Sequence, residues 1–208
     1  ANLTGGSGSN LIDATDFSNG SVTIDGTAGN DTILGGSQDD VLIGGGDRDS
    51  IRGGSGDDTI DGGAGNDILI GNGGIDVLRQ QVGGDQTLTN TLLTGQGSDV
   101  LDGTIELITL IGDNNANTID ASIYTDGSVT IMGLGGDDVL IGGSQADRIE
   151  GGDGADSLLG GAGNDKLIGK SGPDTLNGQA GNDSVFGGSG SDDVDGGSGD
   201  DTVDGQSG

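Results

Sequence analysis

A nine-residue period is the feature that most constrains this chain. Six consecutive units from Gly26 and eight from Gly133 each place glycine first, aspartate sixth and a large aliphatic residue eighth. Because alternate side chains of a strand face opposite sides, position eight predicts a short strand with one inward aliphatic side chain. The repeated aspartates are Asp31, Asp40, Asp49, Asp58, Asp67, Asp76, Asp138, Asp147, Asp156, Asp165, Asp174, Asp183, Asp192 and Asp201.

The units match the pattern GGxGxDxUx, in which U is a large aliphatic residue. On these residues the chain resembles the RTX family of hemolysin-type calcium-binding repeats. The nonapeptides cover more than half of the 208 residues in strict phase, and such repetition makes the motif specific. The resemblance implies an all-β fold, a parallel β-roll or β-solenoid, in which two nonapeptides make one turn and calcium ions lie between successive turns.

The chemistry of the repeated residues favours the same ligand. Glycines at positions one, two and four allow positive φ, so carbonyl oxygens can converge on one point. Calcium takes about six to eight oxygen ligands, which carbonyl and carboxylate groups supply. An alternative is that the aspartates are ordinary solvated turn residues, although turn preference alone would also accept Asn or Ser at position six.

Strands on alternating sides of a roll stack each unit on the next but one. Asp31 is therefore expected to share an ion with Asp49, and Asp40 with Asp58. The arrangement predicts about ten calcium ions in all, roughly four in the first array and roughly six in the second.

The charge balance limits the partners of the chain. Thirty-five acidic and six basic residues give a net charge of −29, which argues against a nucleic-acid partner and favours a cationic one. The absence of Cys and His excludes a disulfide framework, a thiolate zinc site and the commonest general base. No apolar stretch approaches about 18 residues, so no membrane span is expected. Low hydrophobicity with high charge is also typical of disorder.

Three units depart from the pattern at position four, where Gln38, Asp47 and Gln145 replace glycine. A side chain disfavours the left-handed conformation by roughly 1 kcal/mol. We therefore expect distorted turns or weaker calcium binding in these three units.

A longer repeat is superimposed on the short one. A shift of 107 residues aligns the segment from Asn10 to Gly26 with that from Asn117 to Gly133, and places Phe17 opposite Tyr124. Neutral Asn10 and Asn117 occupy the aspartate slot, which indicates leader turns held by packing rather than by metal. The two aromatic residues are expected to plug the core, with a ligand platform as the alternative.

The chain is expected to contain four segments. These are leader turns at 1–25, a first array at 26–79, an inter-array leader at 80–132 and a second array at 133–208 that ends with the start of a further nonapeptide. The phase slips between Gln80 and Leu93, whereas Asp99 keeps the regular slot and is a further candidate calcium ligand. One continuous solenoid with a local insertion is expected, and two rolls joined by a flexible seam are the alternative.

These features predict a structural module rather than an enzyme, since no nucleophile, base or oxyanion arrangement is recognised. The expected partners are calcium ions and the neighbouring repeats of a longer bacterial protein, secreted or displayed at the cell surface. Two other functions stay open: an adhesin segment that binds a glycan or surface ligand, and an RTX accessory tail of a secreted enzyme.

Overall fold

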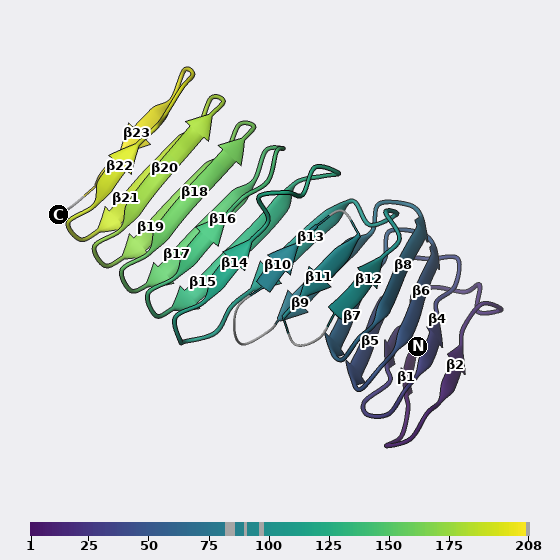
Figure 1. Ribbon diagram of the computed structural model, residues 1–208. Helices are drawn as coiled ribbons and strands as arrows, with labels where there is room; N and C mark the ends of the chain where they lie inside the picture. Colours follow the sequence, from purple (N-terminus) through teal and green to yellow (C-terminus); the bar gives the residue numbers. More distant parts are fainter. Residues whose placement is uncertain (82–85, 90, 96–97, 207–208) are drawn as a thin grey trace. The chain divides into compact units, whose positions relative to one another are not determined.

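The computed structural model describes residues 1–81, 86–89, 91–95 and 98–206, and these form strands and turns without a helix. They divide into two compact units, Ala1–Gln80 with Thr91–Ile108 and Gln81–Asn90 with Thr109–Gly208. In each unit short strands lie in two sheets, and successive strands of the arrays alternate between the two sheets (Figure 1). The predicted all-β parallel solenoid is confirmed.

The phase slip predicted between Gln80 and Leu93 includes residues 82–85 and 90, and the start of a further nonapeptide includes residues 207–208. These positions lie outside the described residues. Within the described ranges, no helix is long and apolar enough to cross a membrane.

The described residues of the first unit form five strands in one sheet and six in the other. The first sheet consists of β1 (Asn2–Thr4), β3 (Thr23–Asp25), β5 (Val41–Gly46), β7 (Thr59–Ala64) and β9 (Val77–Gln81). The second consists of β2 (Leu11–Asp13), β4 (Thr32–Leu34), β6 (Ser50–Ser55), β8 (Ile68–Gly73), β12 (Ser98–Leu101) and β11 (Leu92–Thr94). The array strands follow the nonapeptides, because each begins directly after the repeated aspartate.

The second unit has the same construction. Its first sheet consists of β13 (Leu107–Ile111), β15 (Val129–Gly135), β17 (Arg148–Asp153), β19 (Lys166–Ser171), β21 (Ser184–Ser189) and β23 (Thr202–Asp204). Strand β13 begins just before the division between the units. Its second sheet consists of β10 (Gln86–Leu88), β14 (Thr118–Asp120), β16 (Val139–Ile141), β18 (Ser157–Ala162), β20 (Thr175–Ala180) and β22 (Asp193–Asp195). Both sheets therefore continue from the leader into the second array.

Strand register follows the period of the sequence. In the arrays, strands pair in parallel so that Leu42 faces Ile60, and equivalent residues are 18 positions apart. The leader turns are longer, with equivalent residues 21 positions apart. The strands β11 and β12 depart from this scheme, since Leu92 and Val100 pair in antiparallel orientation. Two nonapeptides thus make one turn, as the sequence predicts.

The core is a narrow ladder formed by the residues at position eight. Among its members, Ile60 and Leu158 are fully buried and face equivalent residues of the turns on either side. The ladder opens at the final turn, where Val203 is 47% exposed because β23 has a neighbour on one side only. So thin a core buries little apolar surface per residue, and the turns must contribute to stability.

The two aromatic leader residues differ in burial. Tyr124 is 1% exposed and plugs the core as predicted. Phe17 is 38% exposed, so the same prediction is wrong for Phe17. Its loop lies in the outermost turn of the first unit, beside Leu3 of the exposed strand β1. A side chain in that turn has a packed neighbour on one side only.

Candidate metal sites

The repeated aspartates stack in columns along the turns. In each column the backbone N–H of one aspartate donates to Oδ1 of the aspartate one full turn later. Asp31 N donates to Asp49 Oδ1 at 2.8 Å, and Asp165 N donates to Asp183 Oδ1 at 2.7 Å. The predicted stacking of each unit on the next but one is therefore confirmed. These bonds give Oδ1 of each aspartate a fixed partner and thereby fix the position of Oδ2.

The second carboxylate oxygen is buried and has no hydrogen-bond partner in most array turns. Burying an ionised oxygen without a partner is strongly unfavourable, so these atoms require a compensating cation or a proton. The oxygens concerned are Oδ2 of Asp31, Asp49, Asp58, Asp67, Asp76, Asp138, Asp156, Asp165, Asp174, Asp183 and Asp192.

Glycine at position one leaves a space beside each of these oxygens. A Cβ atom on Gly26 would lie 2.5 Å from Asp31 Oδ2 and 2.5 Å from the carbonyl oxygen of Gly44. A Cβ atom on Gly160 would meet Asp165 Oδ2 at 2.5 Å and the carbonyl oxygen of Gly178 at 2.6 Å. A carboxylate from one turn and a carbonyl from the next thus converge where no side chain intrudes.

Burial and repulsion disfavour the charged form of these carboxyl groups. Burial, together with the carboxylates of Asp76 and Asp40, raises the pKa of Asp58 to about 7, although a backbone hydrogen bond opposes the shift. Burial and the neighbouring column residues likewise raise the pKa of Asp165 to about 7. The pKa is raised to about 6 for Asp49, Asp67, Asp99, Asp138 and Asp174.

The donor set fits calcium. Calcium prefers hard oxygen ligands, accepts carbonyls together with carboxylates and tolerates irregular geometry. Within the described ranges, no group of three or more acidic, His or Cys side chains gathers as a preformed metal site. Backbone carbonyls would therefore have to complete the coordination shell of a bound ion, and the glycine at position one leaves room for them. A parallel solenoid with such turns belongs to the class of calcium-binding β-rolls.

The comparison with protein families identifies the particular family. The chain belongs to the RTX calcium-binding nonapeptide repeat family, whose model matches four times, at residues 18–51, 43–78, 132–167 and 168–203. Calcium binding by the repeats follows from this membership. No curated protein sequence matches the chain.

The aspartates that the sequence predicts as ligands lie in the stacked columns, and their surroundings differ at the column ends. Asp99 is 4% exposed and accepts a hydrogen bond from Asp67 N at 3.1 Å, so it continues a column of the first unit. Asp192 and Asp201 are half-buried because the last turns have fewer neighbours. Whether each aspartate binds calcium stays a prediction.

One column residue was missed from the sequence. Glu106 Oε2 accepts a hydrogen bond from Asp76 N at 2.8 Å, where the next column aspartate would otherwise lie. A Cβ atom on Gly71 would lie 2.5 Å from the carbonyl oxygen of Thr104, which takes the place of the glycine carbonyls of the arrays. The nonapeptide phase instead assigns Ile108 to position six of this unit, so the sequence pattern contained no signal for Glu106.

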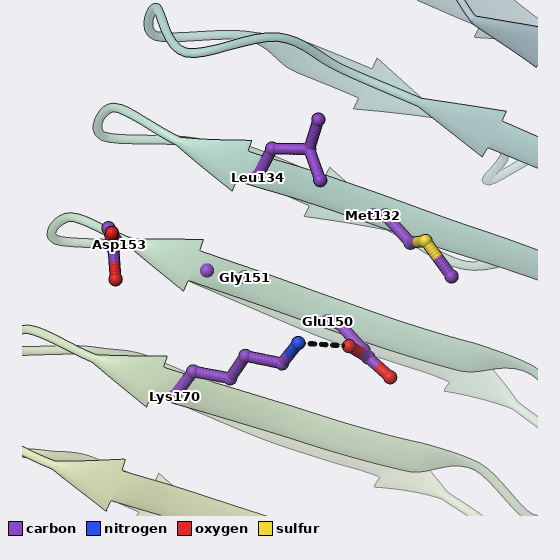
Figure 2. Close-up of a pocket in the computed structure, with 7 residues that line it drawn as sticks. Met132, Leu134, Glu150, Gly151, Asp153 and Lys170 are labelled. Carbon is purple, nitrogen blue, oxygen red and sulfur yellow. Dashed lines mark ion pairs between the residues drawn. The ribbon is translucent and has the colours of Figure 1, made fainter.

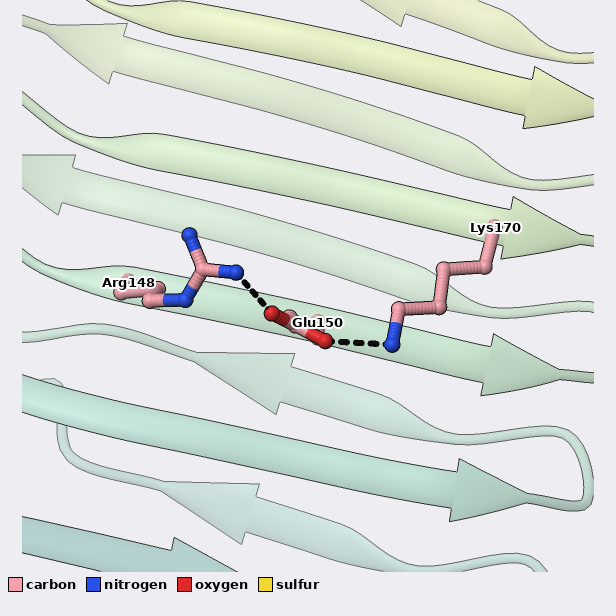
Figure 3. Close-up of polar contacts among 3 residues, drawn as sticks. All are labelled: Arg148, Glu150 and Lys170. Carbon is pink, nitrogen blue, oxygen red and sulfur yellow. Dashed lines mark hydrogen bonds and ion pairs between the residues drawn. The ribbon is translucent and has the colours of Figure 1, made fainter.

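A separate charged cluster lies on the outward face of the second unit. Glu150 on β17 forms ion pairs with Arg148 and with Lys170 on β19, the latter with an Nζ–Oε2 distance of 2.5 Å (Figure 3). Burial opposes ionisation of Glu150, but the hydrogen bond from Lys170 and the charge of Arg148 outweigh it and lower the pKa. Met132 and Leu134 lie on the neighbouring strand β15 and line a pocket together with the Glu150–Lys170 pair (Figure 2). Both basic side chains are paired with Glu150, and the Lys170 pair links β17 to β19.

Proposed function

We propose that this chain is a calcium-stiffened structural spacer within a large secreted or cell-surface protein, and that it folds when calcium binds. The observation that carries the proposal is the series of buried, unpartnered Oδ2 atoms on the repeated aspartates. About ten ions would compensate these oxygens, with pairs such as Asp31 and Asp49 contributing to the same site.

The chain alone has little to stabilise its arrays. Ordering the backbone costs roughly 1 kcal/mol or more per residue, and the chain has 50 glycines, which lose the most freedom. One inward aliphatic residue per nonapeptide offsets only part of this cost. Without a cation, the stacked carboxylates add repulsion. The arrays are therefore expected to be disordered in a medium that lacks calcium.

Bound calcium supplies the positive charge that the columns lack and stabilises the folded state by mass action. Successive sites have a turn in common, because each aspartate hydrogen-bonds to its column neighbour. Ordering one turn therefore prepares the next, and binding is expected to be cooperative along each array.

With the expected affinity, folding of the chain depends on the calcium concentration of the compartment. Extracellular calcium modules commonly bind at about 0.1 to 1 mM. A chain in that range stays unfolded at the low calcium concentration inside a cell and folds after export.

Circular dichroism during a calcium titration tests the proposal. We expect a steep rise in β signal that excess chelator reverses. Magnesium is the matched control, because its short, strictly octahedral shell suits carbonyl-lined turns poorly. An equal β signal in chelator and in calcium would show that folding does not depend on calcium.

A further inference from the structure

Two array turns have a backbone different from that of the other twelve. In twelve turns, positions two and four both have positive φ, even where position two carries a side chain, as in Thr27 at 77° and Lys170 at 82°. The exceptions are the turns that contain Gly36 and Gly143, in which neither position has positive φ. Both are GGSQ turns, with glutamine at position four.

The altered backbone supplies the second oxygen of the aspartate with a partner. Gly36 N donates to Asp40 Oδ2 at 2.7 Å, and Gly143 N donates to Asp147 Oδ2 at 2.6 Å. Oδ1 of each aspartate already accepts a bond at 2.8 Å, from Val22 N and Val129 N respectively. Both oxygens of Asp40 and of Asp147 are therefore satisfied within the protein.

The leader turns show the same geometry with a neutral side chain. Gly6 N donates to Asn10 Oδ1 at 2.6 Å, and Asp113 N donates to Asn117 Oδ1 at 2.8 Å. Each bond spans four residues, as do the bonds in the GGSQ turns. The arrangement thus forms around an uncharged amide and requires no cation.

The neighbours of the GGSQ turns also differ from those of the regular turns. A Cβ atom on Gly36 would lie 3.1 Å from the carbonyl oxygen of Phe17 and 3.2 Å from that of Ala14, and Ser144 N donates to the carbonyl oxygen of Tyr124 at 3.2 Å. Each GGSQ turn therefore lies against an aromatic leader loop, at the first position of its column. The next turns of the two columns are regular ones: Asp58 follows Asp40, and Asp165 follows Asp147.

We propose that the GGSQ turns, which contain Asp40 and Asp147, bind no calcium. The first calcium-binding turns of these two columns are then those of Asp58 and Asp165. The inference rests on the proposed function and revises the family pattern, which would assign all fourteen repeated aspartates to calcium. On this assignment the GGSQ turn joins the leader to the array. Its backbone hydrogen-bonds both oxygens of the aspartate beside the leader, whereas the next turn of the column leaves one carboxylate oxygen free to bind an ion.

Matched double variants of the full chain test the assignment. Asp40→Asn with Asp147→Asn changes the two GGSQ turns, and Asp58→Asn with Asp165→Asn makes the same change one turn later. Bound calcium is counted by native mass spectrometry at saturating calcium, after circular dichroism has confirmed that each variant is folded. We expect the first variant to retain the wild-type count and the control to lose at least about two ions.

The calcium midpoint of folding provides a second readout. It should rise in both variants, because asparagine offers one acceptor oxygen to the two N–H groups that bond Asp40 and Asp147, and it should rise further in the control, which also loses ions. Loss of ions from the first variant equal to that from the control would overturn the assignment. A wild-type chain that binds no calcium would instead overturn the proposed function, so the two failures are distinguishable.

Discussion

The leader turns and the array turns form the same solenoid but satisfy their polar atoms differently. In the leader of the second unit, Asn117 fills the turn with an amide whose oxygen is bonded to the backbone, and Tyr124 fills the core. In the array, Asp156 and Asp174 occupy equivalent slots but leave one buried oxygen each without a partner. The comparison shows that turns of the same solenoid can satisfy their buried polar atoms with backbone hydrogen bonds or can leave an oxygen that requires an ion.

The largest expected effect is on local stability when calcium is limiting. Amide hydrogen exchange in the second unit should lose protection first in β18 to β22, whose turns depend on the metal, and last in β14 and β15 of the leader. Mass spectrometry of peptic peptides measures this order. Simultaneous loss of protection in leader and array would mean that the two kinds of turn do not differ in metal dependence.

The next effect concerns pH in the presence of chelator. The pKa of Asp58 and of Asp165 is raised to about 7 in the folded chain, against a reference value of 3.8. The folded state therefore binds protons more tightly, and the destabilisation present above pH 7 should diminish as the pH falls toward 4. Because several carboxyl groups titrate together, the effect should exceed that of a single substitution.

Circular dichroism of the calcium-free chain measures this response. We expect more β signal at pH 5 than at pH 8, and no such gain for the calcium-loaded chain. Equal disorder at both pH values would show that carboxylate repulsion is not what keeps the calcium-free arrays unfolded.

A smaller effect separates the two leaders. Tyr124→Ala should lower the free energy of unfolding by about 3 kcal/mol or more, because the side chain is fully buried. Phe17→Ala should lower it by only about 1 kcal/mol, because the ring is partly exposed. Denaturant melts of the calcium-loaded variants measure both values. Equal losses would contradict the difference in packing.

The smallest effect is expected at the charged cluster of the second unit. Glu150→Gln should change the free energy of unfolding by less than about 1 kcal/mol, since the basic partners Arg148 and Lys170 are 41% and 49% exposed and solvent screens their charges. The calcium midpoint should stay unchanged, because the cluster lies outside the aspartate columns. A shifted midpoint would indicate coupling between the outward face and the turns.

Much of the fold was predictable because its determinants are local and periodic. The strict spacing of glycine, aspartate and aliphatic residue predicted the strands and the inward position of residues such as Leu158, and the β-roll that the resemblance implies predicted the stacking of Asp31 on Asp49. The structure shows all three. The expected distortion at position four is present at Gln38 and Gln145. The turn with Asp47 is not distorted, because Asp47 adopts φ of 73°, a conformation that Asp tolerates better than most residues; weaker calcium binding there stays a prediction.

The sequence by itself determined the period, the class of turn and the location of the carboxylates, because each depends on residues within one nonapeptide. Only the tertiary structure decided which carboxylate oxygens lack a partner, since that depends on the backbone four residues earlier and on the adjacent turn. Asp40 and Asp58 have the same slot in the sequence, yet Asp40 Oδ2 is hydrogen-bonded and Asp58 Oδ2 is not. The end of a column at Glu106 and the exposure of Phe17 likewise depend on neighbours distant in the chain.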